Sequence, residues 1–250
     1  MNLIIDIGNT RTKMAWFDDD KMVKQTHLLS KSINIETLLE QNSDNNIIVS
    51  TVNKKIDKSI NSKSVFLFDL TTPLPILSLY KSSTIGMDRL AAAVGAFSHY
   101  PSKDCLIIDL GSAITIDFLS SKAVFEGGNI SPGLSIRFKS LNNFTNNLPL
   151  VDSVGEINLT SKTSEDAIRS GVVNGILFEL KMYIDLYKIR YPKLQVILTG
   201  GDSIFFANQL KNRIFANNSN QGEIEGRLIV DIDLVLNGLN TILKRNVNKA

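Results

Sequence analysis

The chain has 250 residues, of which 43% are hydrophobic and 21% charged, a composition typical of a soluble globular protein with one or two domains. Its formal net charge of +2 gives no long-range field that would attract nucleic acid or a membrane surface, so a small-molecule partner is favoured. The single cysteine excludes a disulfide framework, and no apolar run reaches the length of a membrane span, so we expect a cytoplasmic protein without a leader.

The first hundred residues predict a sheet with a few helices. LIIDIG (3–8) is a buried strand that ends in a glycine turn, and RTKMAWFD (11–18) and KMVKQTHL (21–28) continue it as a meander. Spacing predicts a helix over 32–41, strands over 45–52 and 64–70, and an extended connection at the two prolines of 71–77. The polar stretch 54–63 could form a short helix, and 86–100 predicts a helix with an apolar face.

The same pattern then restarts. Residues 104–112, 113–120 and 123–130 read as three more strands, with Cys105 as an inert core residue. Helices are predicted over 134–144 and 164–190, a strand over 193–201, and further helices over 202–215 and 234–245. Strand meanders followed by helices, found twice, indicate an α/β architecture with mixed sheets.

Two turns share one pattern, in which a strand ends in aspartate, an apolar residue and glycine. The first continues with Asn9 and Thr10, and the second with Ser112 and Ala113. Glycine lets backbone N–H groups approach a ligand, small hydroxyls can donate to anionic oxygens, and Lys13 adds a compact positive charge. An aspartate beside such a cradle suits a cation that accompanies phosphate. Either turn alone could be a simple turn, whereas two at equivalent positions could hold a polyphosphate from both sides.

Five motifs in order resemble type III pantothenate kinase, a family of the acetate-kinase, sugar-kinase, heat-shock-chaperone and actin superfamily. They are DIGNTRTK (6–13), GMDR (86–89), DLGSAITID (109–117), GGNISPG (127–133) and TGGD (199–202). The resemblance implies two tandem ribonuclease-H-like (actin-like ATPase) domains, 1–102 and 103–250, with the final helix free to pack back on the first. It also implies transfer of the γ-phosphate of ATP, carried with Mg²⁺, to pantothenate in coenzyme A biosynthesis.

Phosphorylating an alcohol requires a group that can accept the hydroxyl proton. His27 and His99 lie in no motif, so we expect a carboxylate, and Asp88 is the candidate at the start of a helix. Arg89 could neutralise the phosphate or bind the acceptor's carboxylate, although the spacing alone also fits a first-turn acid and a solvated arginine. The resemblance implies that Gly86, Met87, Asp88 and Arg89 hold the substrate, with Asp88 as the base.

The resemblance implies roles for further residues. The ATP loop comprises Asp6, Ile7, Gly8, Asn9, Thr10, Arg11, Thr12 and Lys13, with Asp6 organising Mg²⁺, and Gly111 and Ser112 also contact ATP. Asp109 matches a monovalent-cation site for K⁺ or NH₄⁺, and residues 198–202 match an adenosine-contacting turn.

Tyr80 and Thr163 match positions that contact pantothenate, with Thr163 coming from the partner subunit of a homodimer. Tyr80 could instead be an aromatic residue at the edge of the core, and Thr163 a helix N-cap. The two glycine pairs of GGNISPG either turn the chain or shape the acceptor pocket. Gly171 and Gly175, one helical turn apart, favour close helix packing.

The sequence departs from the family's pattern in two places, and two functions other than pantothenate kinase remain open. Serine stands at 112 where the family usually has threonine, and the segment before Gly86 lacks the family's Asn-Pro and is one residue short. The rivals are a non-catalytic transcriptional accessory relative and a kinase for another small hydroxy-acid. Retention of Asp6, Asp88, Arg89 and Asp109 argues against the first.

Overall fold

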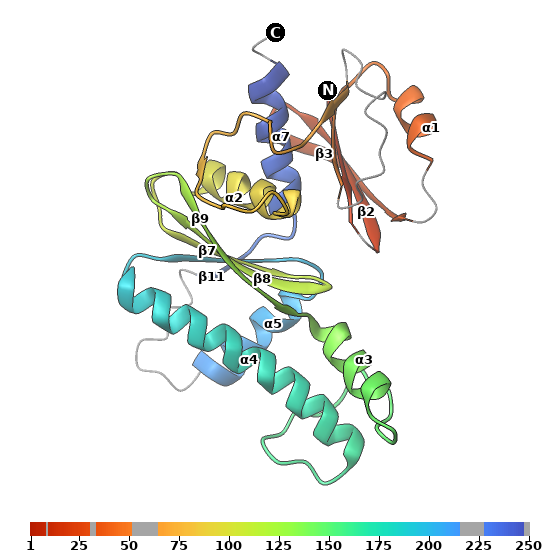
Figure 1. Ribbon diagram of the computed structural model, residues 1–250, viewed down its shortest axis with the longest axis vertical. Coiled ribbons are helices and arrows are strands. Elements are labelled where there is room, and N and C mark those ends of the chain that lie inside the picture. Colours follow the sequence, from red (N-terminus) through yellow and green to blue (C-terminus); the bar gives the residue numbers. More distant parts are fainter. Residues whose placement is uncertain (9, 31–33, 52–64, 216–227, 248–250) are drawn as a thin grey trace. The chain divides into compact units, whose positions relative to one another are not determined.

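The computed structural model describes residues 1–8, 10–30, 34–51, 65–215 and 228–247 (Figure 1). The chain divides into two compact units. The first comprises residues 1–102, 119–127 and 233–250, and the second residues 103–118 and 128–232. No helix within the described ranges is both long and apolar enough to cross a membrane.

The sheet of the first unit has five strands in the order β3-β2-β1-β4-β5. They are β1 (Asn2–Ile7), β2 (Arg11–Asp18), β3 (Lys21–Leu29), β4 (Asn46–Thr51) and β5 (Val65–Leu67). The predicted meander is confirmed, since β2 runs antiparallel to both β1 and β3, while β1 lies parallel to β4. Alternation along β2 turns Met14 into the core beside Leu3 and Ile5, and β1, apolar on both faces, takes the central position.

Two helices of the first unit pack very closely. They are α2 (Met87–His99) and the C-terminal helix α7 (Leu234–Val247), drawn in yellow and dark blue in Figure 1. A β-carbon on Gly95 would overlap the carbonyl oxygen of Leu234, and one on Gly238 would overlap that of Ala91, so small residues permit this approach. The short helix α1 (Ile35–Glu40) begins at Asn34, whose side chain accepts the N–H of Thr37.

Buried polar contacts fasten α7 to the sheet. Asn240, which is 2% exposed, donates to the carbonyl oxygen of Asp19 at 2.8 Å and accepts from the Asn2 side chain at 2.8 Å. Lys244 pairs with Asp19 and Asp20 at the β2–β3 turn, and these side-chain hydrogen bonds raise its pKa. The last helix therefore belongs to the first unit, as the sequence interpretation allowed.

The second unit is built on β7 (Cys105–Leu110), β8 (Ala113–Ser120), β9 (Val124–Pro132), β10 (Gln195–Thr199) and β11 (Leu228–Val230). Their order is β11-β10-β7-β8-β9, and β10 runs parallel to both β7 and β11. The first residues of β9, Val124 and Phe125, belong to the first unit and pair there with β6 (Leu77–Ser78). Cys105 is fully buried, as predicted, and burial followed by the charge of Asp104 raises the pKa of its thiol to about 12.

Helices cover this sheet: α3 (Leu134–Phe144), α4 (Ser164–Arg190) and α5 (Ser203–Gln209). The predicted bounds of α3 and α4 agree with the structure. The helix predicted over 202–215 instead divides into α5 and a π-helical turn, η3 (Leu210–Phe215). The helix considered for 54–63 lies outside the described residues. The mixed α/β fold is confirmed, and the boundary between residues 102 and 103 stays a prediction.

Candidate active site

The first D-x-G turn connects β1 to β2 in the first unit. Asp6, near the end of β1, lies opposite Lys13 on β2 and opposite Ser50 on β4. The turn closes where the N–H of Gly8 donates to the carbonyl oxygen of Arg11 at 3.1 Å. The predicted aspartate and lysine of the loop are therefore immediate neighbours.

Ser30 supports the same turn from just beyond the end of β3. Its hydroxyl donates to the carbonyl oxygen of Gly8 at 2.8 Å and lies 3.1 Å from the hydroxyl of Thr12. Thr12 is fully buried, whereas Thr10 and Arg11 are exposed, so Thr12 has a structural partner and Thr10 faces solvent. Ile7 and Gly8 are partly exposed, and Asn9 lies outside the described residues.

Asp6 occupies an unusual electrostatic environment. Its residue is only partly exposed, and desolvation of the carboxyl raises its pKa from 3.8 to about 6. The negative charge of Asp88 adds to this rise, whereas Lys13 and a hydrogen bond with Ser50 oppose it. The structure thus brings Asp6 and Lys13 of the first motif and Asp88 of the second into one electrostatic cluster.

Asp88 lies in the first turn of α2. Gly86 is the N-cap and has extended backbone, with no side chain capping the helix. The Asp88 Oδ1 accepts the backbone N–H of Arg89 at 2.8 Å, and a β-carbon on Gly86 would overlap that same oxygen. Glycine at the N-cap therefore leaves room for the Asp88 carboxylate at the positive end of the helix. Met87, between them, is partly exposed.

Arg89 is 5% exposed and meets Tyr80 at the same site. Its guanidinium carbon lies 5.1 Å from the centre of the Tyr80 ring, and Nη1 donates to the Tyr80 hydroxyl at 3.4 Å. The ring also packs against Phe125, with centroids 6.4 Å apart. The shortened segment before Gly86 therefore still delivers Tyr80 to Arg89.

Gly127 limits where the Tyr80 ring can lie. Its φ of +99° is in the region that favours glycine, and a β-carbon there would lie 3.1 Å from the ring. The first glycine of GGNISPG thus combines a special backbone conformation with a close approach to the acceptor-binding tyrosine expected from the resemblance.

The second D-x-G turn lies in the second unit. Asp109, near the end of β7, is opposite Thr199 on β10, as Asp6 is opposite Ser50. A β-carbon on Gly200, where φ is +89°, would overlap the Asp109 carboxylate, and one on Gly111 would lie 3.3 Å from it. The T-G-G turn and the D-x-G turn therefore meet around one carboxylate.

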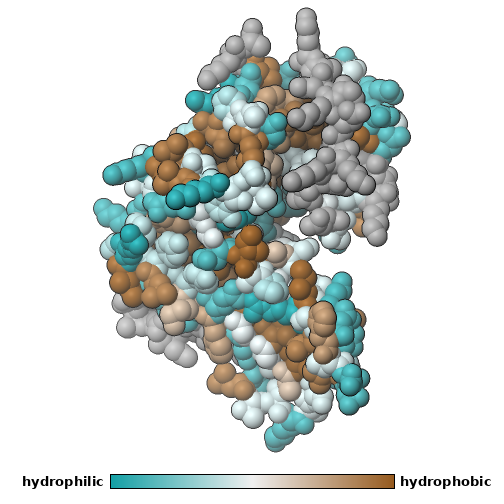
Figure 2. Space-filling view, viewed as in Figure 1, coloured by the Kyte–Doolittle hydropathy of each residue, from teal (hydrophilic) through white to brown (hydrophobic). Residues whose placement is uncertain are grey.

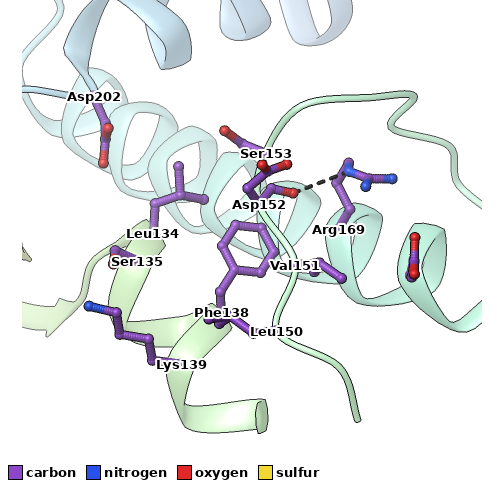
Figure 3. Close-up of a pocket in the computed structure, with 11 residues that line it drawn as sticks. Leu134, Ser135, Phe138, Lys139, Leu150, Val151, Asp152, Ser153, Arg169 and Asp202 are labelled. Atoms are coloured by element: carbon purple, nitrogen blue, oxygen red, sulfur yellow. Dashed lines mark hydrogen bonds between the residues drawn. The ribbon is translucent and has the colours of Figure 1, made fainter.

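A pocket of about 590 Å³ lies in the second unit, beside the T-G-G turn (Figure 3). Leu134 and Phe138 of α3 form part of its apolar lining, while Asp202 lies at one end and Arg169 of α4 at the other. Arg169 is held there, because its Nε donates to the carbonyl oxygen of Asp152 at 3.1 Å and Nη1 pairs with Asp166 at 2.6 Å. The charged and apolar lining suits a ligand with a flat apolar part and several polar groups.

Thr163 is the N-cap of α4. Its hydroxyl accepts the backbone N–H of Asp166 at 3.2 Å and donates to the Asp166 carboxylate at 2.7 Å. The residue is exposed, so the capping alternative is confirmed and the substrate-contact role stays a prediction.

The outward face of α4 carries small and apolar residues at intervals of three or four. Phe178, Met182, Leu186 and Ile189 are 51 to 80% exposed, and Gly171 and Gly175 continue the same stripe toward the N-terminus. Figure 2 shows separate brown patches on the surface of the second unit, with white and teal surface between them. We call these six residues the α4 stripe. Exposed apolar residues in such a row form a candidate interaction surface.

Sequence patterns missed several contributors to these sites. Ser30 and Ser50 lie near strand ends as single small polar residues, and nothing in their spacing marks them. Arg137 of α3 and Glu179 of α4, which pair across the second unit, belong to none of the five motifs. Ser50 becomes recognisable only once the pairing of β4 with β1 is known, because that register places it opposite Asp6.

Comparison with known proteins agrees with these motifs. The family model for type III pantothenate kinase matches residues 2–185. A type III pantothenate kinase from Bacteroides fragilis is 42% identical, covering 98% of both chains.

Solved structures extend the likeness to the fold. A protein from Campylobacter jejuni, described as a member of the Baf family of transcriptional activators, has a TM-score of 0.65 and 25% identity, over 98% of this chain and 99% of that one. The activator of 2-hydroxyisocaproyl-CoA dehydratase from Clostridium difficile, with bound ADPNP, has a TM-score of 0.53 and 14% identity over 99% and 96% of the chains. The second likeness concerns the fold alone.

Proposed function

Because the chain belongs to the type III pantothenate kinase family, we propose that Asp88 is the base of its reaction and that Asp6 organises the divalent cation of ATP. The protein is an ATP-dependent kinase that phosphorylates pantothenate in coenzyme A biosynthesis. The proposals concern which residues carry out this chemistry.

The juxtaposition of Asp6 and Asp88 carries the assignment. A desolvated carboxyl beside a second carboxyl is costly to ionise, and the cost falls when a cation arrives. Mg²⁺ is commonly bound by one or two carboxylates together with substrate phosphates and water, so the Asp6 carboxylate fits it. Mg²⁺ would neutralise charge on the transferring phosphate.

Asp88 and Arg89 are suited to the acceptor alcohol. The Asp88 carboxylate, oriented by the N–H of Arg89, can accept the hydroxyl proton of pantothenate as the γ-phosphate is transferred. The Arg89 guanidinium, stacked on Tyr80, can bind the carboxylate of pantothenate, and Gly86 and Met87 line the approach. Lys13 and the loop 6–13 would hold the phosphates of ATP.

The resemblance assigns a contact with ATP to the second D-x-G turn. Gly111 and Ser112 offer a backbone N–H and a hydroxyl, and Asp109 would hold K⁺ or NH₄⁺ near the phosphates. The glycines beside Asp109 support this role, because a β-carbon on Gly200 or Gly111 would occupy the space next to the carboxylate. The pocket at Asp202 would take the nucleoside end of ATP, in agreement with the adenosine-contacting turn that residues 198–202 resemble.

The α4 stripe supports a homodimer. Its glycines would let a second copy of α4 approach closely, and its exposed apolar residues would be covered. Thr163, the N-cap of the same helix, would then contact pantothenate in the partner's site while keeping its cap.

An acceptor panel with a magnesium titration tests the site assignment. ADP release should require pantothenate rather than other small hydroxy-acids, and Asp6→Asn should raise the Mg²⁺ concentration needed for half-maximal rate more than Asp88→Asn does. An unchanged magnesium requirement in Asp6→Asn would remove Asp6 from the cation site.

A further inference from the structure

Arg137 of α3 and Glu179 of α4 form an ion pair within the second unit, and each side chain is 22% exposed. Both residues also bind the turn that ends β9. The Arg137 Nε donates to the carbonyl oxygen of Pro132 at 2.7 Å, and the Ser131 hydroxyl donates to Glu179 Oε1 at 2.6 Å. The Arg137 Nη2 donates to the Ser131 hydroxyl at 3.3 Å, so the pair grips the turn from two helices.

The turn that this ion pair holds packs against the second D-x-G loop. The N–H of Gly133 donates to the carbonyl oxygen of Ser112 at 3.0 Å. A β-carbon on Gly133 would overlap the carbonyl oxygens of both Gly111 and Ser112. Since no space separates the two backbones, a movement of residues 131–133 toward the loop displaces it, and a movement away breaks the hydrogen bond between Gly133 and Ser112.

We propose that Arg137 and Glu179 are positioning residues for the ATP-binding loop Gly111–Ser112. The inference rests on the proposed function, in which this loop contacts ATP. A guanidinium is planar and carries several fixed donors, so simultaneous bonds to a backbone carbonyl and a carboxylate fix the orientation of the turn. Glu179 anchors the arginine to the long helix α4 and holds Ser131 directly.

An ion pair that only connected α3 to α4 would stabilise the fold without affecting nucleotide binding. The neighbouring pair Lys181–Asp185 on α4 provides a matched contrast. It spans one helical turn, its side chains are 33% and 34% exposed, and it lies within a single helix. Pairs of this kind contribute little to stability.

The test compares Arg137→Met with Lys181→Met in the full-length protein. We expect Arg137→Met to raise both the ATP KM and the Kd for a non-hydrolysable ATP analogue at least about tenfold, the equivalent of one charge-assisted hydrogen bond. The pantothenate KM should change by less than about twofold, well under the tenfold that one such bond represents. Arg137→Lys should lie between, because an ammonium keeps the charge but cannot form the fork. Lys181→Met should bind the analogue like the wild type.

One further variant separates the possible failures. Ser112→Ala reports on the loop itself: if it leaves analogue binding unchanged, the proposed ATP contact fails, whatever Arg137 does. If Ser112→Ala weakens binding and Arg137→Met does not, the positioning inference alone is wrong.

Exchanging the charges of Arg137 and Glu179 distinguishes a role in positioning the loop from a role in connecting the two helices. Arg137→Glu combined with Glu179→Arg should restore the melting temperature but not the ATP KM, because a carboxylate at position 137 cannot donate to the carbonyl oxygen of Pro132. Full recovery of the ATP KM would mean that the ion pair only connects α3 to α4 and does not position the loop. If Arg137→Met does not fold, Arg137→Lys and Glu179→Gln decide by the same criteria.

Discussion

The Tyr80 ring lies against the space that a β-carbon on Gly127 would occupy, at 3.1 Å from that position. The glycine has φ of +99°, so an L side chain there would be strained even without the ring. The ring also stacks with the buried Arg89, and Phe125 packs beside it. The position of Tyr80 and Arg89, which we propose to bind the acceptor, thus depends on a residue from another motif.

Gly127→Ala should therefore raise the KM for pantothenate and leave the KM for ATP nearly unchanged. The backbone strain costs about 1–3 kcal/mol, and the displaced ring adds to the effect on the acceptor. A double-mutant cycle with Tyr80→Ala checks the route, because contacting residues are energetically coupled. If Gly127→Ala raises the pantothenate KM as much in the Tyr80→Ala background as in the wild type, the glycine does not act through the ring.

Asp88→Asn should lower kcat at least about a hundredfold, the lower end of what a general base contributes. Asparagine keeps the shape of the side chain but cannot take the proton, so ATP binding should remain nearly intact. The measurement is steady-state ADP release with both substrates varied. Retention of more than about a tenth of the wild-type kcat, an effect too small for a general base, would rule out Asp88 in that role.

Asp6 makes the stability of the nucleotide-free protein depend on pH. Its pKa is about 6 in the folded state and near 3.8 when unfolded, so the folded state binds more protons between these values. The free energy of unfolding therefore falls as pH rises through this range. Above about pH 6 the stabilisation from the protonated Asp6 carboxyl is lost.

Asp6→Asn should remove this loss. We expect the variant to be more stable than the wild type by about 1–3 kcal/mol at neutral pH, allowing for partial solvent exposure, and to lose this advantage near pH 4. Urea unfolding at several pH values, without Mg²⁺ or nucleotide, measures the difference. Asp18→Asn, at the exposed end of β2, is the control for removing a surface carboxylate from the same sheet. A constant difference between Asp6→Asn and wild type at all pH values would contradict the burial of this carboxyl.

The monovalent cation expected at Asp109 should appear in the salt dependence of the rate. Replacing sodium by potassium or ammonium should increase activity steeply, because the ion would neutralise phosphate charge. Asp109→Asn should raise the ATP KM more than the pantothenate KM. Equal wild-type rates in all three salts would exclude the cation site.

Mixing two inactive variants tests the shared active site. Asp88→Asn and Thr163→Arg damage different parts of a site, so a mixed dimer contains one site free of both changes. Subunit exchange should restore activity if Thr163 serves the partner. Thr163→Asn, which keeps a capping side chain, controls for the loss of the cap. No recovery after proven exchange would refute the shared site.

Disruption of the α4 stripe tests the dimer separately. Met182→Glu places a charge in the proposed apolar contact, so it should shift the protein to monomers in sedimentation velocity. Lys181→Glu, one position away and outside the stripe, should leave the assembly unchanged.

Local patterns in the sequence determined most of the elements and the identity of the motifs. Period-two alternation along 11–18 and the long helical stretch 164–190 predicted β2 and α4, because burial on one face leaves its period in the residues. The division of 202–215 into α5 and a π-helical turn was not predictable, since apolar spacing over so few residues does not separate the two helix types.

Tertiary structure alone decided which motifs meet. Asp6 and Asp88 are recognisable separately, but the pKa of Asp6 is raised first by burial of its carboxyl and then by the charge of Asp88. The helix α2, which carries Asp88, packs against β4 and α7. Arg137 and Glu179 carry no signal in the sequence, because a contact between two helices depends on how their faces pack. The sequence specifies the chemistry of each turn, whereas burial and charge at the site depend on contacts between segments far apart in the chain.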